Sequence, residues 1–235
     1  MQSPEQQVQA LSRFAVFSTT PPEGLAQIAA ACSWRTFKAG QLIIGHQDRS
    51  HDVVFLVAGK ARASVYSASG KQVSFRDIAD GGLFGELAAI DNQPRSASIE
   101  ALTDATAMVM PQPVFHRLLA EHPDFMMGVM RHLTAMVRGL TDRVVEFSTL
   151  AVKNRIHAEL IRLVGPAADR TGDAVLSPAP THLDIANRIA THREAVTREL
   201  NRLEELGVVV KEGRTLRIRN VQMLKAMIEA SEADS

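Results

Sequence analysis

The chain has 235 residues, enough to bury a substantial core in one large or two modest domains, and its 26 Lys and Arg residues balance 26 Asp and Glu residues. The net charge of zero excludes a global basic field, so any site for a polyanion must be local. No apolar run reaches the roughly 18 residues of a membrane span, and the first residues lack the features of a signal peptide. The one cysteine cannot form an internal disulfide or a Cys-rich metal site. We therefore expect a cytoplasmic protein with no membrane association.

The first half of the chain changes from helical to strand-like periodicity. Residues 5–32 space their apolar side chains as helices do, with a break at which Pro22 and Glu23 suit a helix start. From about residue 34 to residue 112, short β-branched runs alternate with Gly-containing turns. This pattern favours an antiparallel sandwich or jelly roll.

One short segment between two strand-like runs contains a pair of oppositely charged residues. Residues 84–97, FGELAAIDNQPRSA, place Glu86 and Arg95 nine positions apart, each beside a small residue. A structural salt bridge between these two side chains is one interpretation, and a binding site is the other. The rest of the chain has to decide between them.

After residue 112 the periodicity is helical again. Six apolar residues recur at steps of three and four and form a narrow seam: Val129, Leu133, Met136, Leu140, Val144 and Phe147. Such a seam is typical of a helix that pairs with a second copy of itself, and packing on the protein's own sheet is the alternative. Residues 165–180 are loop-like and mark a domain boundary.

The segment THLDIANRIATHREAVTRELNRLEELGVV predicts two helices with a tight junction at residues 190–192. Thr181 and Asp184 form a weak capping box at the start of the first helix. The second helix has an apolar face and a polar face, and the polar face includes Arg193, Glu194, Thr197 and Arg198. Arg can bind guanine O6 and N7, and Glu can accept from cytosine N4. A solvated ion pair between Glu194 and Arg198 is the alternative for this face alone.

The residues that follow favour DNA binding. The stretch GVVVKEGRTLRIRN predicts two short strands around Gly213, which form a wing with four basic residues: Lys211, Arg214, Arg217 and Arg219. A helix-turn-helix followed by a basic wing is a specific combination, and its local positive charge suits DNA phosphates.

Three segments together resemble the Crp/Fnr family of bacterial transcription regulators, in particular its Crp-like branch: FGELAAIDNQPRSA, the seam helix ending in LTDRVVEF, and THREAVTREL. The resemblance covers nearly the full length and implies an α+β protein. The implied domains are a cyclic-nucleotide-binding β-roll at residues 1–122, a dimerisation helix at residues 123–150 and a winged helix-turn-helix DNA-binding domain at residues 151–235. The implied function is allosteric transcription regulation without enzymatic activity, in which a bound cyclic nucleotide sets a homodimer for palindromic promoter DNA and RNA polymerase is a further partner.

By the same resemblance, residues 84–97 form a phosphate-binding cassette. Arg95 would hold the nucleotide phosphate with two parallel N–H donors, and ionised Glu86 would accept from the ribose 2′-hydroxyl. Gly85 allows the backbone to come close, and a short helix after it would present N–H groups to the anion. The implied ligand-binding residues are Gly85, Glu86, Leu87, Ala88, Arg95, Ser96, Arg76 and Thr141.

The base is expected to contact the dimerisation helix. Thr141 matches a hydroxyl position of the family, its neighbour Leu140 departs from the family's paired hydroxyls, and Arg76 stands where the family has a small hydroxyl residue. A hydroxyl can accept from adenine N6 or donate to guanine O6, so Thr141 alone does not choose between them. Cyclic AMP is the first expectation and cyclic GMP is the second.

The resemblance also implies a set of DNA contacts on the C-terminal helices and the wing. These residues are Thr181, His192, Arg193, Glu194, Thr197, Arg198, Lys211 and Arg214. Ala190 replaces the usual turn Gly and His192 replaces a usual Ser, so base preference outside the core of each half-site stays open.

Two other functions remain as alternatives. A cupin-like metalloenzyme needs clustered ligands on its strands, whereas His46 and His51 stand in a polar turn and the next histidine is His116. A sensor of the same fold for a different effector is disfavoured by the intact cassette and, for a haem or an iron–sulfur cluster, by the single Cys32. We therefore expect no metal site.

Overall fold

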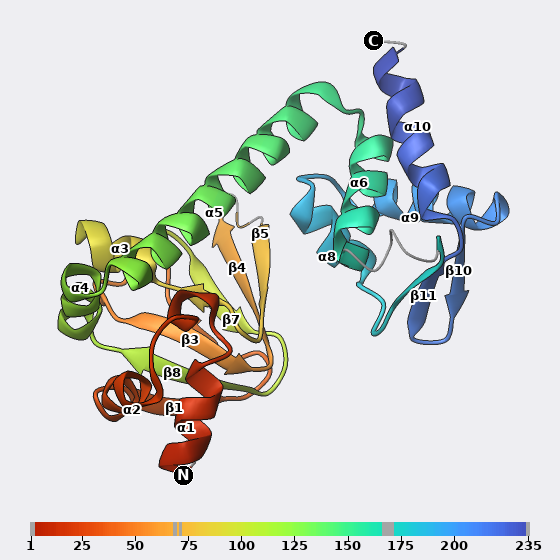
Figure 1. Cartoon of the computed structure of the whole chain (residues 1–235). Coiled ribbons are helices and arrows are strands. Elements are labelled where there is room, and N and C mark those ends of the chain that lie inside the picture. Colours follow the sequence, from red (N-terminus) through yellow and green to blue (C-terminus); the bar gives the residue numbers. More distant parts are fainter. Residues whose placement is uncertain (1–2, 68–69, 71, 166–171, 234–235) are drawn as a thin grey trace. The chain divides into compact units, whose positions relative to one another are not determined.

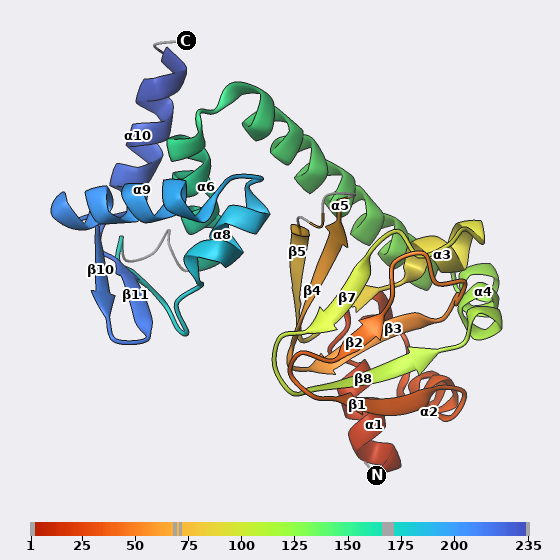
Figure 2. The same cartoon turned by 180° about the vertical axis from the view of Figure 1, so that it is seen from behind.

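The computed structural model describes residues 3–67, 70, 72–165 and 172–233, and these residues form two compact units (Figures 1 and 2). The first unit contains residues 3–67 and 74–137, and the second contains residues 70, 72–73, 138–165 and 172–233. Each unit encloses a hydrophobic core of its own. The long helix α5, Pro123–Thr149, contributes its first half to the first unit and its second half to the other.

Two α-helices begin the first unit where the sequence predicts them. Helix α1, Pro4–Leu11, starts after Ser3, whose hydroxyl accepts from the backbone N–H of Gln6 in a complete capping box. A 3₁₀ turn, Ala15–Phe17, leads to helix α2, Pro22–Ala30, which has proline in its first turn. Both helices pack on the core of the unit.

The strands of the first unit confirm the predicted jelly roll. Its described residues form two four-stranded antiparallel sheets (Figure 1). One sheet has the order β1-β8-β3-β6, with strands Ser33–Phe37, Ala105–Met110, Val53–Ala58 and Leu83–Phe84. The other has the order β2-β7-β4-β5, with strands Leu42–Ile44, Ser98–Ala101, Lys60–Tyr66 and Gln72–Ala79. The inward side chains of the two sheets meet in one buried cluster that includes Leu56, Ile99 and Ala101.

Three helices follow or interrupt the strands. The cassette helix α3, Glu86–Asp91, lies between β6 and β7, and helix α4, Gln112–Glu121, follows β8. The helical stretch predicted after residue 112 is divided at His122, because Pro123 lacks the N–H that a continuing helix would need.

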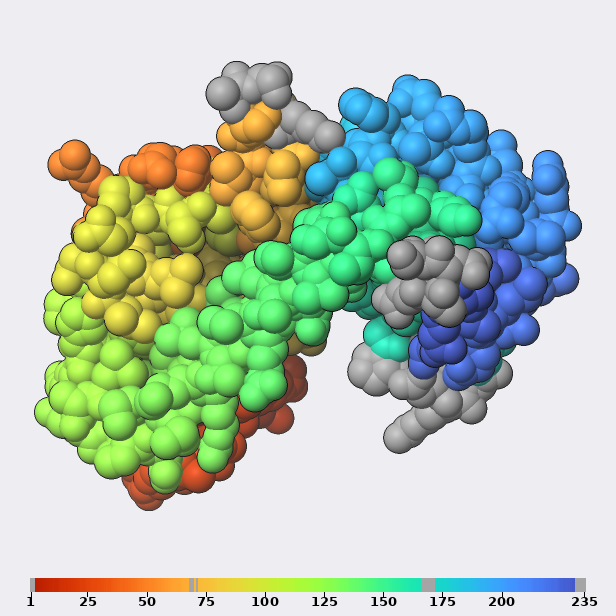
Figure 3. Space-filling view, turned by 90° about the horizontal axis from the view of Figure 1, so that it is seen from above, coloured from red at the N-terminus to blue at the C-terminus, as the bar shows by residue number. Residues whose placement is uncertain are grey.

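The apolar seam of α5 has two different environments. Val129 is 2% exposed and Leu133 packs against the core of the first unit, so this part of the seam contacts its own domain. Further along the helix, Leu140 is 50% exposed and Val144 is 64% exposed. In the space-filling view, α5 is open to the viewer along much of its length (Figure 3).

The second unit has the predicted helix-turn-helix and wing. After α6, Val152–Val164, it contains α8, His182–Arg188, and α9, Arg193–Glu205, followed by the hairpin β10–β11 and helix α10, Val221–Ala233. The hairpin strands are Val209–Glu212 and Thr215–Ile218. Ile185, Val196 and Leu203 are among the residues of the core between these elements.

One strand of the second unit was not predicted. Strand β9, Ala174–Leu176, lies inside the segment that the sequence analysis assigns to a loop, and it pairs antiparallel with β11. Three residues are too few to produce a recognisable alternation, and β9 exists because a partner strand distant in sequence pairs with it. Residues 166–171 of the same prediction lie outside the described residues.

The described residues contain no helix that is long and apolar enough to cross a membrane. Within the same residues, no group of three or more His, Cys, Asp or Glu side chains could hold a metal ion.

Candidate functional site

The cassette turn depends on a glycine. Gly85 precedes α3 with φ of 89°, a left-handed conformation that strains other residues. A Cβ at this position would lie 2.6 Å from Nη1 of Arg95 and 2.8 Å from the carbonyl oxygen of Asp52. Both the backbone conformation and the close approach of Arg95 therefore require a residue without a side chain.

Arg95 is a buried cation that is held by Gly85 of the cassette turn and by two residues of the segment between β2 and β3. It is 3% exposed, and its guanidinium donates to the carbonyl oxygen of Gly85 at 2.8 Å, to that of Asp52 at 2.7 Å and to the hydroxyl of Ser50 at 3.1 Å. Burial lowers its pKa from the ordinary value, against the opposing charges of Asp52, Asp48 and Glu86. Its donors contact these groups rather than Glu86, so the two cassette charges do not form the structural salt bridge that the sequence left open.

Glu86 is a buried carboxylate at the first position of α3. It is 2% exposed, and its Oε1 lies 3.5 Å from Nε2 of His132 on α5. Arg76 on β5 is a further cation near it: burial lowers the pKa of Arg76, and the charge of Glu86 opposes that shift. The side chain of Arg76 is held by the carbonyl oxygen of Leu83 at 3.4 Å. Glu86, His132 and Arg76 thus bring three ionisable groups together from α3, α5 and β5.

The other residues of the implied ligand set lie on or beside the same turn, with one exception. Ala88 is buried within α3, whereas Leu87 and Ser96 are exposed. Thr141 is exposed on the half of α5 that belongs to the second unit. The structure therefore brings Gly85, Glu86, Arg95 and Arg76 together within one domain.

In the second unit, helix α9 has the polar face that the sequence predicts, and we call α9 the reading helix. Arg193, Glu194 and Arg198 are exposed on α9, and Val196 and Leu203 are fully buried on its other side, as its periodicity predicts. At the start of α8, Thr181 and Asp184 form both hydrogen bonds of the predicted capping box, each side chain accepting from the backbone N–H of the other residue. In the junction, Ala190 has a φ of 53°, the left-handed conformation for which a glycine is the usual residue.

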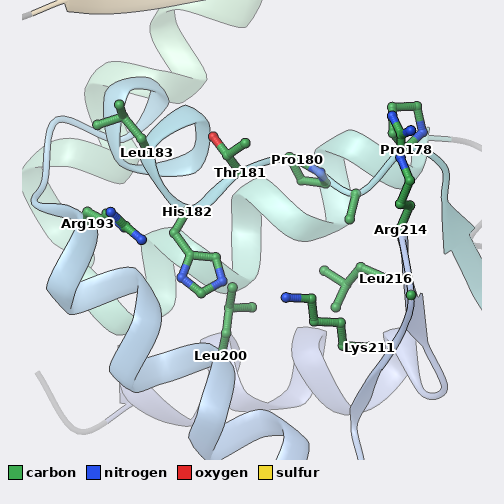
Figure 4. A pocket seen from close by; sticks show the side chains of 12 residues that line it. Pro178, Pro180, Thr181, His182, Leu183, Arg193, Leu200, Lys211, Arg214 and Leu216 are labelled. Atoms are coloured by element: carbon green, nitrogen blue, oxygen red, sulfur yellow. The ribbon is translucent and has the colours of Figure 1, made fainter.

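A groove separates the reading helix from the wing (Figure 4). Three basic residues line it, Arg193 from α9 and Lys211 and Arg214 from the hairpin, with Thr181 at the start of α8. His182, which the sequence analysis did not name, also faces into this groove. Its pKa is lowered by burial and by the charges of Lys211 and Arg193.

The hydroxyl of Thr197 is already engaged in the second unit. It donates to the carbonyl oxygen of Arg193 at 3.0 Å, so its oxygen is the acceptor for Nδ1 of His182 at 2.7 Å. His192, the residue before α9, is exposed and makes no side-chain cap. Among the wing cations, Arg217 forms ion pairs with Asp173 and Glu212.

Comparison with known proteins identifies both units. Residues 34–122 match the family of the cyclic nucleotide-binding domain, and residues 154–227 match that of the Crp-like helix-turn-helix domain. The chain belongs to the Crp/Fnr family. It is a transcription regulator with a cyclic nucleotide-binding domain and a DNA-binding domain, and the family is not one of enzymes.

Two curated relatives of the regulator match along almost their whole length. It is 20% identical to the CRP-like cAMP-activated global transcriptional regulator of Mycobacterium tuberculosis, over 91% of this chain and 96% of that protein. It is 24% identical to the cAMP-activated global transcriptional regulator Vfr of Pseudomonas aeruginosa, over 86% of this chain and 96% of that protein. A solved structure of the c-di-GMP responsive global regulator CLP of Xanthomonas campestris matches with a TM-score of 0.70 and 17% identity, over 80% of this chain and 94% of that chain. At that identity the likeness shows the fold alone.

Proposed function

We propose that the regulator binds cyclic AMP in its β-roll, with cyclic GMP as the second candidate, and that the bound nucleotide raises the affinity of a homodimer for palindromic DNA. The observation that carries this proposal is the pair of cassette charges, Arg95 and Glu86, which are buried and not paired with each other. A cyclic nucleotide offers one phosphodiester charge for the arginine and one free ribose hydroxyl for the carboxylate. The names of two relatives as cAMP-activated regulators support the choice of effector.

One observation favours a guanine base or a different effector. Arg76 is a partly buried cation beside Glu86, where the family has a small hydroxyl residue. Arginine donors suit guanine O6 and N7, whereas adenine presents a donor at N6. The solved structure of CLP, named as c-di-GMP responsive, is an example of the same fold with another effector.

The exposed part of α5 supports a homodimer. Val137, Leu140 and Val144 are each at least half exposed and recur at helical spacing, which is an apolar stripe that a second copy of the helix can cover. We propose residues 1–122, 123–150 and 151–235 as the nucleotide, dimerisation and DNA-binding domains. A two-fold dimer then presents two reading helices to half-sites about 34 Å apart on one face of DNA. In this proposal the regulator acts in the cytoplasm, and RNA polymerase is its further partner.

The experiment is a DNA-binding titration by fluorescence anisotropy with a palindromic site, in the absence of nucleotide and with cyclic AMP, cyclic GMP or c-di-GMP. We expect cyclic AMP to raise DNA affinity at least tenfold. Calorimetry on the same samples measures nucleotide binding separately. Equal DNA affinity with and without every nucleotide, or binding of c-di-GMP alone, would contradict the proposal.

A further inference from the structure

The groove between the reading helix and the wing contains a titratable side chain among cations. His182 points from α8 into this groove, with Arg193 of α9 on one side and Lys211 of β10 on the other (Figure 4). Arg214 of the hairpin also lines the groove, and the described residues that line it include no carboxylate. Asp184, the carboxylate on the same helix as His182, caps the start of α8. A group that enters the groove therefore meets positive charge, which suits an anion such as a DNA phosphate.

One hydrogen bond fixes which nitrogen of the neutral His182 ring carries the proton. The hydroxyl of Thr197 donates to the carbonyl oxygen of Arg193 at 3.0 Å, so the hydroxyl oxygen accepts from Nδ1–H of His182 at 2.7 Å. In a neutral imidazole only one of the two nitrogens carries a proton. Nε2 is therefore an acceptor in the neutral ring, and it becomes a donor only when the ring takes up a second proton.

The charge of the ring decides whether it can bind a phosphate. The oxygens of a DNA phosphate are acceptors, so the lone pair of a neutral Nε2 repels them, whereas a protonated ring donates a charge-assisted hydrogen bond. In the protein without DNA, burial lowers the pKa of His182, and the charges of Lys211 and Arg193 lower it further. Since the ordinary pKa of histidine is about 6.5, the ring is mainly neutral at neutral pH. A phosphate among these cations offsets their charge and favours the protonated ring.

We propose that His182 binds a DNA phosphate in its doubly protonated form, so that DNA binding is coupled to the uptake of a proton by this side chain. The proton comes from solvent and binds to Nε2, while Nδ1–H keeps its hydrogen bond to Thr197 on the reading helix. The phosphate raises the pKa of His182 above its value in the protein without DNA. DNA affinity is therefore highest at low pH and falls as the pH rises through the pKa of the DNA-bound state. The inference uses the DNA binding of the family and does not depend on which nucleotide binds to the first unit.

The test measures binding of the full-length protein to a rhodamine-labelled duplex of random sequence, by fluorescence anisotropy at low salt between about pH 5.5 and pH 8. A phosphate contact acts on DNA of any sequence, so the assay needs neither a palindromic site nor a nucleotide. We expect the wild type to bind about tenfold more tightly at the lower pH, the change that a shift of about one unit in a single pKa produces.

Three variants isolate the contribution of the ring. His182→Asn keeps a donor close to the position of Nδ1 but cannot be protonated, and it should lose most of the tenfold change. His182→Arg is always charged, and at pH 8 it should bind about as tightly as the wild type does at pH 5.5. His46→Asn, at an exposed position of the first unit, is the matched control and should keep the full pH dependence.

Calorimetry in two buffers that differ in protonation enthalpy counts the protons taken up on DNA binding near pH 6.5, and His182→Asn should take up fewer than the wild type. If the wild type shows no pH dependence, or if His182→Asn keeps all of it, the inference is overturned. A purely structural role through Thr197 would lower affinity by the same factor at every pH, which also overturns it. Should His182→Asn not fold, His182→Gln provides the same comparison, since its side chain does not titrate. Failure of every nucleotide to bind would refute the proposed function and leave these results unchanged.

Discussion

Replacement of Glu159 by Gln should destabilise the second unit by about 3 kcal/mol. Glu159 lies on α6 and is fully buried, and it forms ion pairs with Arg143 of α5 at 3.3 Å and Arg188 of α8 at 3.4 Å, and with Arg162. Removing one partner of a buried ion pair costs about 3–5 kcal/mol, because it leaves uncompensated charge. The side chains of Arg143 and Arg188 are 11% and 5% exposed, so water cannot replace the lost carboxylate charge. Since the amide keeps one acceptor oxygen, we expect the lower end of that range.

The single tryptophan allows this loss to be assigned to one unit. Trp34 lies in β1 of the first unit, so its fluorescence follows unfolding of that unit, while far-ultraviolet circular dichroism follows the helices of both. With a denaturant slope of about 1–1.5 kcal/mol per molar urea for a unit of this size, Glu159→Gln should lower the transition of the second unit by roughly 2–3 M. The control is Glu204→Gln, on an exposed position of α9, which should shift it by less than 0.5 M. Equal shifts for the two variants would refute the argument from buried charge.

Three further predictions concern the cassette, the exposed helix and the thiol. Arg95→Ala should lower cyclic nucleotide affinity at least 100-fold, or about 3 kcal/mol, because a charge-assisted bidentate contact to the phosphate is lost; calorimetry measures this, and affinity within a few-fold of wild type would contradict the assignment. Leu140→Glu should convert the proposed dimer to monomers in sedimentation equilibrium, since a charge replaces a half-exposed apolar side chain of the stripe. Burial raises the pKa of the Cys32 thiol to about 12, so the folded protein should resist alkylation by iodoacetamide up to pH 9 and react in urea as the thiol titrates near its ordinary value. Rapid alkylation of the folded protein at pH 8 would contradict the burial of this thiol.

Those parts of the fold that depend on residues close together in the sequence could be predicted from it. The capping box of α8 involves Thr181 and Asp184, three residues apart, and the two faces of α9 follow from a periodicity within one helix. Strand β9 was missed because its pairing with β11 joins residues about forty positions apart, and nothing within Ala174–Leu176 signals that contact. The break at His122 was also missed, although Pro123 beside it is a recognisable helix start.

The candidate site divides in the same way. Gly85, Glu86 and Arg95 form a motif within one turn, so the sequence alone singles them out. The partners of Arg95 are different, because the carbonyl oxygen of Asp52 is a backbone group that any residue would supply. His132 reaches Glu86 only because α5 packs on the β-roll, and its position in a helical repeat gives no sign of that contact.

Helix α5 carries three kinds of side chain in succession, and their order suits a helix that links nucleotide, partner and DNA. His132 lies beside Glu86 in the first unit, and Leu140 is half exposed. Arg143 forms an ion pair with the buried Glu159 in the second unit. His132 and Arg143 are eleven residues apart within the helix α5, Pro123–Thr149. A ligand shifts a conformational equilibrium only if it makes different contacts in the two states. A nucleotide that binds beside Glu86 would lie next to α5 itself, because Nε2 of His132 on α5 is 3.5 Å from this carboxylate, whereas the guanidinium of Arg95 makes no hydrogen bond to α5. The region of Glu86 and His132 is therefore the place at which we expect nucleotide binding to act on α5 and, through Arg143, on the second unit.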